Sequence, residues 1–301
     1  RILLAVHHFP PRYTGGAEWR AHRTARALIE RGHTVRVICV ERVDEAGAHP
    51  LKWEDGLYDG VPVRRLSFNL ASSPDLFRWS YDNTWIGDHL REVIADFKPD
   101  VLHLISGYLV SGRALLVAAE LRVPSIVTLT DFWFLCPRLS LLKSDGHISS
   151  LPTRPEACAQ CLGEERRRYR WLGRLLPGPM RQYWSRQSAA IHRIEDRSRF
   201  LLEALNTARV IISPSNFLRK LHRQLGSLSS AYFAVLLLWF VPRTGQLQVQ
   251  RACEARNPYR GRAQLSTPNL DRGTRWLALD LQKSPSTTGR LFDQVRDQRQ
   301  R

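Results

Sequence analysis

The first forty residues constrain the fold most, because they carry the pattern of one βαβ unit. Residues 2–6 and residues 34–40 are short apolar runs. Between them, a loop ends at Gly15-Gly16 and residues 21–31 have the spacing of a helix. Two parallel strands joined by a helix place that loop at the carboxyl edge of the sheet, where α/β proteins bind phosphorylated ligands.

The glycine loop has a physical reason to bind a ligand. Gly15 and Gly16 lack a Cβ, so backbone amides can approach a ligand closely, and the following helix directs its free N–H groups to the same place. A diphosphate or a sugar hydroxyl fits there, with His8 and Glu18 as candidate binding residues. The alternatives are a tight turn without a ligand and, for His7 and His8, simple packing. The pattern is not G-x-G-x-x-G, so the dinucleotide fingerprint is not met.

Strand-like and helix-like segments continue to alternate up to about residue 225, which predicts an α/β, Rossmann-like, doubly wound parallel sheet. Residues 41–60 are polar and are expected to form a loop. Ser106-Gly107 turns the chain at the same sheet edge, and Gly107 is a further candidate binding residue. The expected strands are residues 61–68, 101–105, 125–129 and 209–213, and the expected helices are residues 76–97, 109–121, 187–208 and 214–225.

Two segments depart from this alternation. Residues 131–185 are rich in Pro, Arg, Trp and Cys and are expected to be an irregular insertion within a domain that spans residues 1–225. Residues 226–301 show no strand or helix period, which predicts an irregular basic C-terminal tail. Its apolar run, residues 231–241, is too short to span a bilayer. Our hypothesis is that this tail is a frameshift or gene-disruption product and not a native second domain.

The positive charge is concentrated in the second half of the chain. The net charge is +17; residues 1–150 contribute +1 (18 basic, 17 acidic), residues 151–225 contribute +9 (15 and 6), and residues 226–301 contribute +7 (12 and 5). Residues 166–172 mix arginines with aromatic residues, which suits an anionic membrane surface better than nucleic acid; a solvated basic segment is the alternative. Without a secretory signal or a disulfide pattern, we expect a cytoplasmic protein, peripheral at the inner face of the membrane.

Three cysteines could form part of a metal site. Cys158 and Cys161 have the C-x2-C spacing of a zinc knuckle, and Cys136 with His147 or a water would complete four ligands. One such pair without a second is weak support for a zinc site. We therefore expect no metal and interpret these cysteines as reduced, unliganded thiols.

Four segments resemble one known family, in order along the chain. Residues 1–18, 99–104, 128–138 and 209–218 are similar to the N-terminal domain of GT-B glycosyltransferases of the retaining family 4 type. The Gly15-Gly16-Ala17-Glu18 loop and the segment from Asp131 through Cys136-Pro137-Arg138 carry most of this likeness.

The resemblance implies transfer of a sugar from a nucleotide-sugar to a sugar or lipid-linked acceptor, such as a precursor of a cell-surface polysaccharide, with retention at the anomeric carbon. It places Gly15 and Gly16 near the donor diphosphate and Asp131 on the acceptor side as a catalytic residue. Arg138 is a candidate phosphate partner. No cofactor is obligatory in such a reaction, because helix-end amides and cations can stabilise the leaving diphosphate.

The chain departs from the family pattern at two points. Thr130 stands where the family usually has a histidine, and a hydroxyl cannot act as a base as imidazole does. The family's Glu-x7-Glu motif is matched in spacing only by Glu156/Glu164 and Glu195/Glu203, which precede the expected place and are interpreted as coincidences.

Two other functional classes stay open. The first is a non-catalytic acceptor-domain remnant or a basic binding protein for membrane or nucleic acid. The second is a nicotinamide-dependent oxidoreductase, for which Glu41 supplies the acidic residue after the second strand but the glycine fingerprint is missing.

Overall fold

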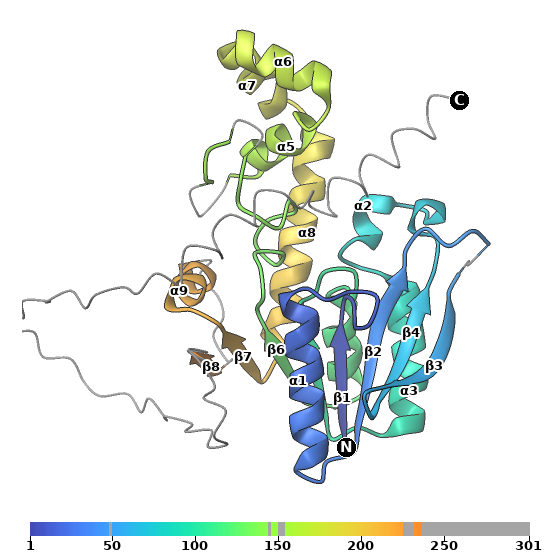
Figure 1. The fold of residues 1–301 in the computed structure, drawn as a ribbon. Helices are drawn as coiled ribbons and strands as arrows, with labels where there is room; N and C mark the ends of the chain where they lie inside the picture. Colours follow the sequence, from blue (N-terminus) through green and yellow to red (C-terminus); the bar gives the residue numbers. More distant parts are fainter. Residues whose placement is uncertain (48–49, 144–145, 150–153, 225–231, 236–301) are drawn as a thin grey trace, which may run out of the picture. The chain divides into compact units, whose positions relative to one another are not determined.

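A computed structural model of the chain describes residues 1–47, 50–143, 146–149, 154–224 and 232–235. All of them belong to one compact unit, which spans residues 1–239. The predicted α/β fold is confirmed: strands and helices alternate along most of the chain (Figure 1). None of the described helices is long and apolar enough to cross a bilayer.

The strands form one sheet in the order β3-β4-β2-β1-β5-β6-β7-β8. Every neighbouring pair is parallel except β3 and β4, which are antiparallel. The strands are β1 (Ile2–Val6), β2 (Val35–Arg42), β3 (Lys52–Tyr58), β4 (Val61–Ser67), β5 (Val101–Ile105), β6 (Ser125–Thr128), β7 (Val210–Ser213) and β8 (Tyr232–Val235).

The helices fall into two groups along the chain, one before strand β6 and one after it. The first helices are α1 (Gly16–Glu30), α2 (Leu76–Trp79), α3 (Thr84–Phe97) and α4 (Arg113–Glu120), with a short 3-10 turn at Leu70–Ser72. The later helices are α5 (Pro155–Gly163), α6 (Arg167–Leu175), α7 (Pro177–Ser185), α8 (Ser188–Asn206) and α9 (Asn216–Gln224).

Strand β1 shows why the sheet is covered on both faces. Its residues alternate between two cores, since successive strand side chains point to opposite faces. Leu4 and Val6 pack in a smaller core with Ala21 and Ala25 of α1. Leu3 and Ala5 pack in a larger core with the inner faces of α3, α4 and α8. The continuous apolar run of β1 is therefore the signature of a doubly covered parallel strand.

Strand β3 corrects the expected loop at residues 41–60. Its side chains are almost all exposed, so it lacks the apolar alternation of an edge strand. It pairs because Asp59 and Gly60 adopt the left-handed conformation (φ 47° and 74°) that a two-residue hairpin turn needs. Arg64 adds a two-pronged ion pair to Asp55, at 2.6 Å and 2.5 Å.

The expected irregular insertion at residues 131–185 is helical over much of its described length. Helices α5, α6 and α7 form there, and α5 packs on α8. The indole of Trp184 fills the space beside Gly163, where a Cβ would lie 2.0 Å from the ring. Aromatic packing of this kind gives short helices an apolar face that composition alone did not reveal.

The C-terminal segment is described only in part. Strand β8, at Tyr232–Val235, pairs with β7 and so adds a strand from the segment expected to be irregular. The rest of residues 226–301 lies outside the described residues, and the hypothesis of a frameshift product stays a prediction.

Candidate functional site

Three adjacent strands end at the same edge of the sheet and bring the candidate residues together. Strand β1 pairs with β5, and β5 pairs with β6, all in parallel. Beyond these strands the chain continues directly into His7, Ser106 and, three residues after β6, Asp131. The carboxyl edge of a parallel sheet is where such proteins place ligands.

The carboxylate of Asp131 is held by three donors. Ser106 Oγ donates to Asp131 Oδ2 at 2.9 Å, and Thr130 Oγ1 donates to the same oxygen at 3.1 Å. The backbone N–H of Trp133 donates to Oδ1 at 2.8 Å. Thr130, which replaces the family's usual histidine, therefore serves to orient this carboxylate. With both oxygens engaged, the carboxyl group of Asp131 has little freedom to turn.

His7 and Glu18 form the second half of the cluster. His7 Nε2 lies 3.2 Å from Glu18 Oε1, and both side chains are largely buried. Burial alone would raise the pKa of Glu18, but the hydrogen bond and the charge of His7 bring that pKa below its usual value. His7 Nδ1 is buried and has no hydrogen-bond partner among the described residues. This nitrogen therefore keeps unused hydrogen-bonding capacity within the cluster.

Tyr108 joins the two halves. Its ring meets the ring of His7 edge-on, with centroids 5.7 Å apart, and its backbone N–H donates to Ser106 Oγ at 3.2 Å. Burial, and then the nearby charge of Asp131, raise the pKa of Tyr108, so its hydroxyl stays protonated and can donate. Sequence reasoning named neither Ser106 nor Tyr108 as a site residue. Their position just after the strand beside β1 was the signal that could have found them.

The loop between β5 and α4 is held in a demanding conformation. Ser106, Leu109 and Ser111 all have positive φ, at 64°, 59° and 79°. Ser111 Oγ stabilises it by accepting from the backbone N–H groups of Asn83 and Arg113 and donating to the carbonyl of Tyr81. Three left-handed non-glycine residues in six positions are typical of functional loops.

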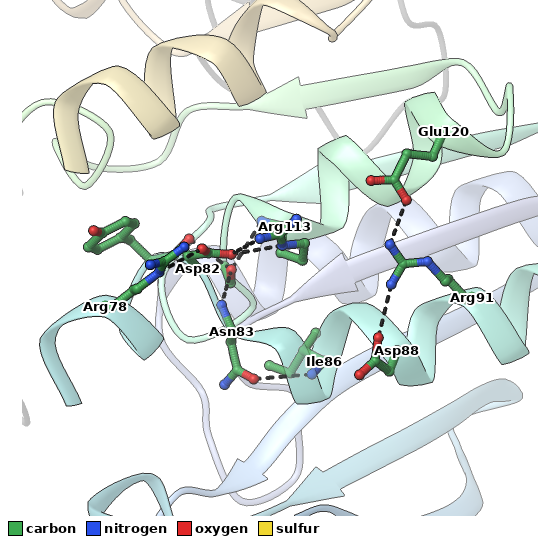
Figure 2. A network of polar contacts seen from close by, with 10 residues as sticks. Arg78, Asp82, Asn83, Ile86, Asp88, Arg91, Arg113 and Glu120 are labelled. Carbon is green, nitrogen blue, oxygen red and sulfur yellow. Dashed lines mark hydrogen bonds and ion pairs between the residues drawn. The ribbon is translucent and has the colours of Figure 1, made fainter. Parts of the chain in front are cut away.

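A buried ion-pair network anchors the far end of this loop (Figure 2). Asp82 accepts from Arg113 Nε at 2.8 Å and from Arg78 Nε at 3.1 Å. Next to it, Asn83 caps α3 by accepting from the backbone N–H of Ile86. The network joins α2, α3 and α4. It thereby holds the C-terminal end of the β5–α4 loop, which carries Ser106 and Tyr108.

The two glycines of the first loop have different surroundings. Gly15 precedes the first turn of α1, and a Cβ there would lie 2.5 Å from Glu18 Oε2. Gly16 faces open space. The residue before α1 supplies no capping side chain, and the Glu18 carboxylate accepts a hydrogen bond from its own backbone N–H. The amides of Gly16 and Ala17 are therefore the ones left for an anion. Glu18 already places a negative charge in this turn.

His8 and Gly107 lie near the site but do not reach toward Asp131. His8 Nδ1 donates to the carbonyl of Val40 at 2.7 Å, and its ring stacks on Tyr13 at 3.8 Å. Burial lowers the pKa of His8. At Gly107 the missing side chain leaves room for Trp133, since a Cβ would lie 2.1 Å from the indole. These two residues shape the loops around the cluster.

Arg138 and the three cysteines form a separate group. Arg138 Nε pairs with Glu165 at 2.9 Å, and Nη1 donates to Cys161 Sγ at 3.5 Å. Cys136, Cys158 and Cys161 line one small cavity together with Arg138. In the part of the chain that the structure describes, no group of three metal-ligating side chains has the geometry to hold an ion. The expected phosphate contact of Arg138 stays a prediction.

Behind the site, Arg197 of α8 is almost fully buried. It donates to the carbonyl of Trp133 and lies over the ring of the same residue, 5.6 Å from its centroid. Burial lowers the pKa of Arg197 to about 10, so the side chain remains charged at neutral pH. It fixes the segment that follows Asp131.

Comparisons with known proteins agree with this architecture. The family described as "Glycosyl transferase 4-like domain" matches residues 15–236. An uncharacterized 42.6 kDa protein in the cps region of Klebsiella pneumoniae is 24% identical over 161 residues, which are 49% of this chain and 41% of that protein. The chain thus spans about two fifths of the length of this curated relative.

Two solved structures show a distant likeness to this chain. One is an α,α-trehalose-phosphate synthase (UDP-forming) from Burkholderia xenovorans in complex with glucose-6-phosphate, with a TM-score of 0.38, 8% identity, and coverage of 73% of this chain and 42% of that one. The other is UGT2 from Phytolacca americana, complexed with UDP-2-fluoro-glucose and pterostilbene, with a TM-score of 0.39, 14% identity, and coverage of 77% and 52%.

Proposed function

The chain belongs to the glycosyl transferase 4-like domain family, and we propose that it forms the acceptor-side domain of an enzyme that transfers a sugar from a nucleotide-sugar. The observation that carries this proposal is the cluster of His7, Glu18, Ser106, Tyr108 and Asp131 at the carboxyl edge of the sheet. It combines acceptors, a protonated hydroxyl and an unpartnered imidazole nitrogen, which are the groups that bind sugar hydroxyls.

Each residue of the cluster has a chemical role in this proposal. Both carboxylate oxygens of Asp131 are held by protein donors, so Asp131 accepts a further hydrogen bond from an acceptor hydroxyl and orients it. His7 Nδ1 and the Tyr108 hydroxyl bind neighbouring hydroxyls. The amides of Gly16 and Ala17 at the start of α1 stabilise the charge that develops on the leaving diphosphate. Such a reaction retains configuration if the acceptor attacks from the side that the diphosphate leaves.

The acceptor we propose is a sugar or a lipid-linked sugar of a cell-surface polysaccharide. The likeness to a protein in the cps region supports this class, although that relative has no assigned activity. A cytoplasmic location stays part of the proposal; Cys39, Cys136 and Cys161 form no disulfide within the described residues, which is in keeping with a reducing compartment.

The test is release of nucleoside diphosphate from a panel of UDP-, GDP- and ADP-sugars, with and without short saccharide acceptors. We expect turnover with one donor, and its loss in Asp131→Asn and in His7→Ala. Asp196→Asn, an exposed carboxylate on α8, is the matched control and should retain turnover. If the two site variants release diphosphate as fast as the control, the assignment of the cluster is wrong.

The second candidate is a non-catalytic domain that binds an acceptor only. Glu18 favours it, because a carboxylate in the first turn of α1 repels a diphosphate. Calorimetric titration with UDP, GDP and ADP separates the two functions. Binding of one nucleotide supports the enzyme, and no heat with any of them, together with binding of a saccharide, supports the binding domain.

A further inference from the structure

Helices α6 and α7 expose an unusual set of side chains. Residues 166–186 contain seven arginines and no acidic residue. The exposed fractions of Trp171, Leu175 and Leu176 are 62%, 57% and 51%. Residues 175–179, where α6 ends and α7 begins, read Leu-Leu-Pro-Gly-Pro, and every one of these residues is exposed. We call these side chains, with Arg167 and Arg174, the α6–α7 surface.

This exposure is not the result of poor packing between the helices. Tyr169 and Trp184 meet edge-on, with ring centroids 5.5 Å apart, and Met180 and Trp184 are buried. In Figure 1, α6 and α7 lie next to each other beside α5. Trp171 is two residues from Tyr169, about 200° around the helix, and Leu175 is one turn further along the same face as Trp171. The helix pair thus has a packed inner face and a separate apolar outer face.

The positive charge of this surface is uncompensated. Arg170 is occupied, since it donates to the backbone carbonyls of Glu164 and Glu165, and Arg168 lies over the ring of Tyr169. Within the described residues, no carboxylate pairs with Arg167, Arg174 or Arg181. Arg167 and Arg174 lie within one turn of Trp171 on the same helix, so cations border the apolar face.

We propose that the α6–α7 surface docks on an anionic lipid surface. A tryptophan, two leucines and a proline-rich tip bordered by arginines match an interfacial segment, in which apolar side chains enter the acyl boundary and cations meet anionic headgroups. Nucleic acid would use the arginines and the indole, but it offers nothing to Leu175, Leu176 and the two prolines. An acidic protein is a weaker fit, because it would meet the arginines but leave the apolar side chains of this helical segment without a partner.

The test is vesicle binding by the full chain. Sedimentation with sucrose-loaded vesicles of phosphatidylcholine, alone or with about 30% phosphatidylglycerol, gives a partition coefficient for each variant. Two variants probe the surface: Trp171→Ser with Leu175→Ser for insertion, and Arg167→Gln with Arg174→Gln for charge. Their controls are Leu57→Ser on strand β3, where Leu57 is 74% exposed, and Arg23→Gln on α1 together with Arg31→Gln at the residue that follows α1.

We expect binding to the anionic vesicles only. Removal of two arginines should lower the partition coefficient roughly 30-fold at low ionic strength, at about 1 kcal/mol per cation, and the apolar double variant should also bind more weakly. Because residues 226–301 are also basic, the comparison is between variants and controls that all keep that segment. Circular dichroism confirms that each variant is folded.

Three results would overturn the proposal. Equal binding of the surface variants and their controls would assign the affinity to another part of the chain. Equal binding to neutral and anionic vesicles would remove the electrostatic basis. Binding to single-stranded DNA that the α6–α7 variants weaken, without any vesicle binding, would assign the surface to nucleic acid. None of these results bears on sugar transfer, which is assayed without lipid.

Discussion

Ser106 Oγ donates a hydrogen bond to Asp131 Oδ2 over 2.9 Å and so connects the ends of β5 and β6. The two residues are 25 apart in the sequence, and their strands are paired in parallel. The hydroxyl also accepts from the backbone N–H of Tyr108. One side chain therefore holds both the carboxylate of Asp131 and the backbone of Tyr108 at the proposed acceptor site.

The first prediction concerns this hydroxyl. Ser106→Ala removes one of three donors to Asp131 and should lower the free energy of unfolding by only about 1 kcal/mol. Because Asp131 and Tyr108 lose their common partner, acceptor affinity should fall more than stability. Urea denaturation and acceptor titration measure the two effects. Ser198→Ala, whose hydroxyl bonds to a helix carbonyl in α8, serves as the control; equal acceptor affinity in both variants would contradict a positioning role.

A second prediction concerns the charge at the start of α1. Glu18→Gln keeps the shape of the side chain but removes a negative charge next to amides that we assign to the donor diphosphate. Nucleoside diphosphate should then bind several-fold more tightly, since a charge at a helix end contributes about 0.3–1 kcal/mol. Glu30→Gln at the other end of α1 is the matched control. Weaker binding in Glu18→Gln would show that this carboxylate holds the ligand directly.

Gly107 provides a prediction about packing. In Gly107→Ala the new methyl group would lie 2.1 Å from the Trp133 ring, which also touches buried Arg197. The variant should lose about 1–3 kcal/mol of stability, as expected for an overpacked core. Gly56→Ala, where nothing lies within 4 Å, should be neutral or slightly stabilising. Equal thermal midpoints for the two variants would show that Trp133 moves freely.

How much the sequence could reveal differs between the sheet and the site. The apolar runs predicted β1, β5 and the other buried strands well, because a strand that is covered on both faces consists almost entirely of apolar residues. They missed β3, whose exposed residues carry no pattern apart from the Asp59-Gly60 turn. They also missed the helices of the insertion, because their packing depends on a few distant aromatic contacts, such as Trp184 on Gly163.

Prediction of the site from the sequence was limited, because the role of a residue depends on the side chains that contact it in the fold. The sequence correctly indicated the strand ends, and Asp131 does lie at the sheet edge. It could not reveal that Gly107 makes room for an indole, or that Glu18 lies where a Cβ at Gly15 would be. These are contacts between segments far apart in the chain, or side-chain directions set by the fold, and single-residue types do not encode them.

The buried network of Figure 2 gives a prediction for stability. Asp82 is 1% exposed and is shared by Arg113 and Arg78. Asp82→Asn should destabilise the fold by about 3 kcal/mol, because loss of one partner leaves a charge poorly compensated. Asp88→Asn, which breaks an exposed pair with Arg91, should cost less than about 1 kcal/mol. Chemical denaturation of the two variants decides whether the network holds the β5–α4 loop in place.

His103 gives the last prediction, a dependence of stability on pH. Burial lowers the pKa of His103 to about 4, and its Nε2 lies 2.8 Å from Thr128 Oγ1 on the neighbouring strand. The folded pKa is below the unfolded value of about 6.5, so the neutral ring stabilises the fold at neutral pH, and this contribution is lost as the pH falls from about 6.5 toward 4. Between pH 7.5 and pH 5 the loss should be about 2 kcal/mol. The pKa values of His8, His89 and His222 are lowered as well, so the contribution of His103 is isolated by comparison with His103→Gln. Urea unfolding of both proteins at the two pH values should show a smaller pH effect in the variant, by about 2 kcal/mol; identical pH effects would mean that His103 is protonated in the folded protein as easily as in the unfolded chain.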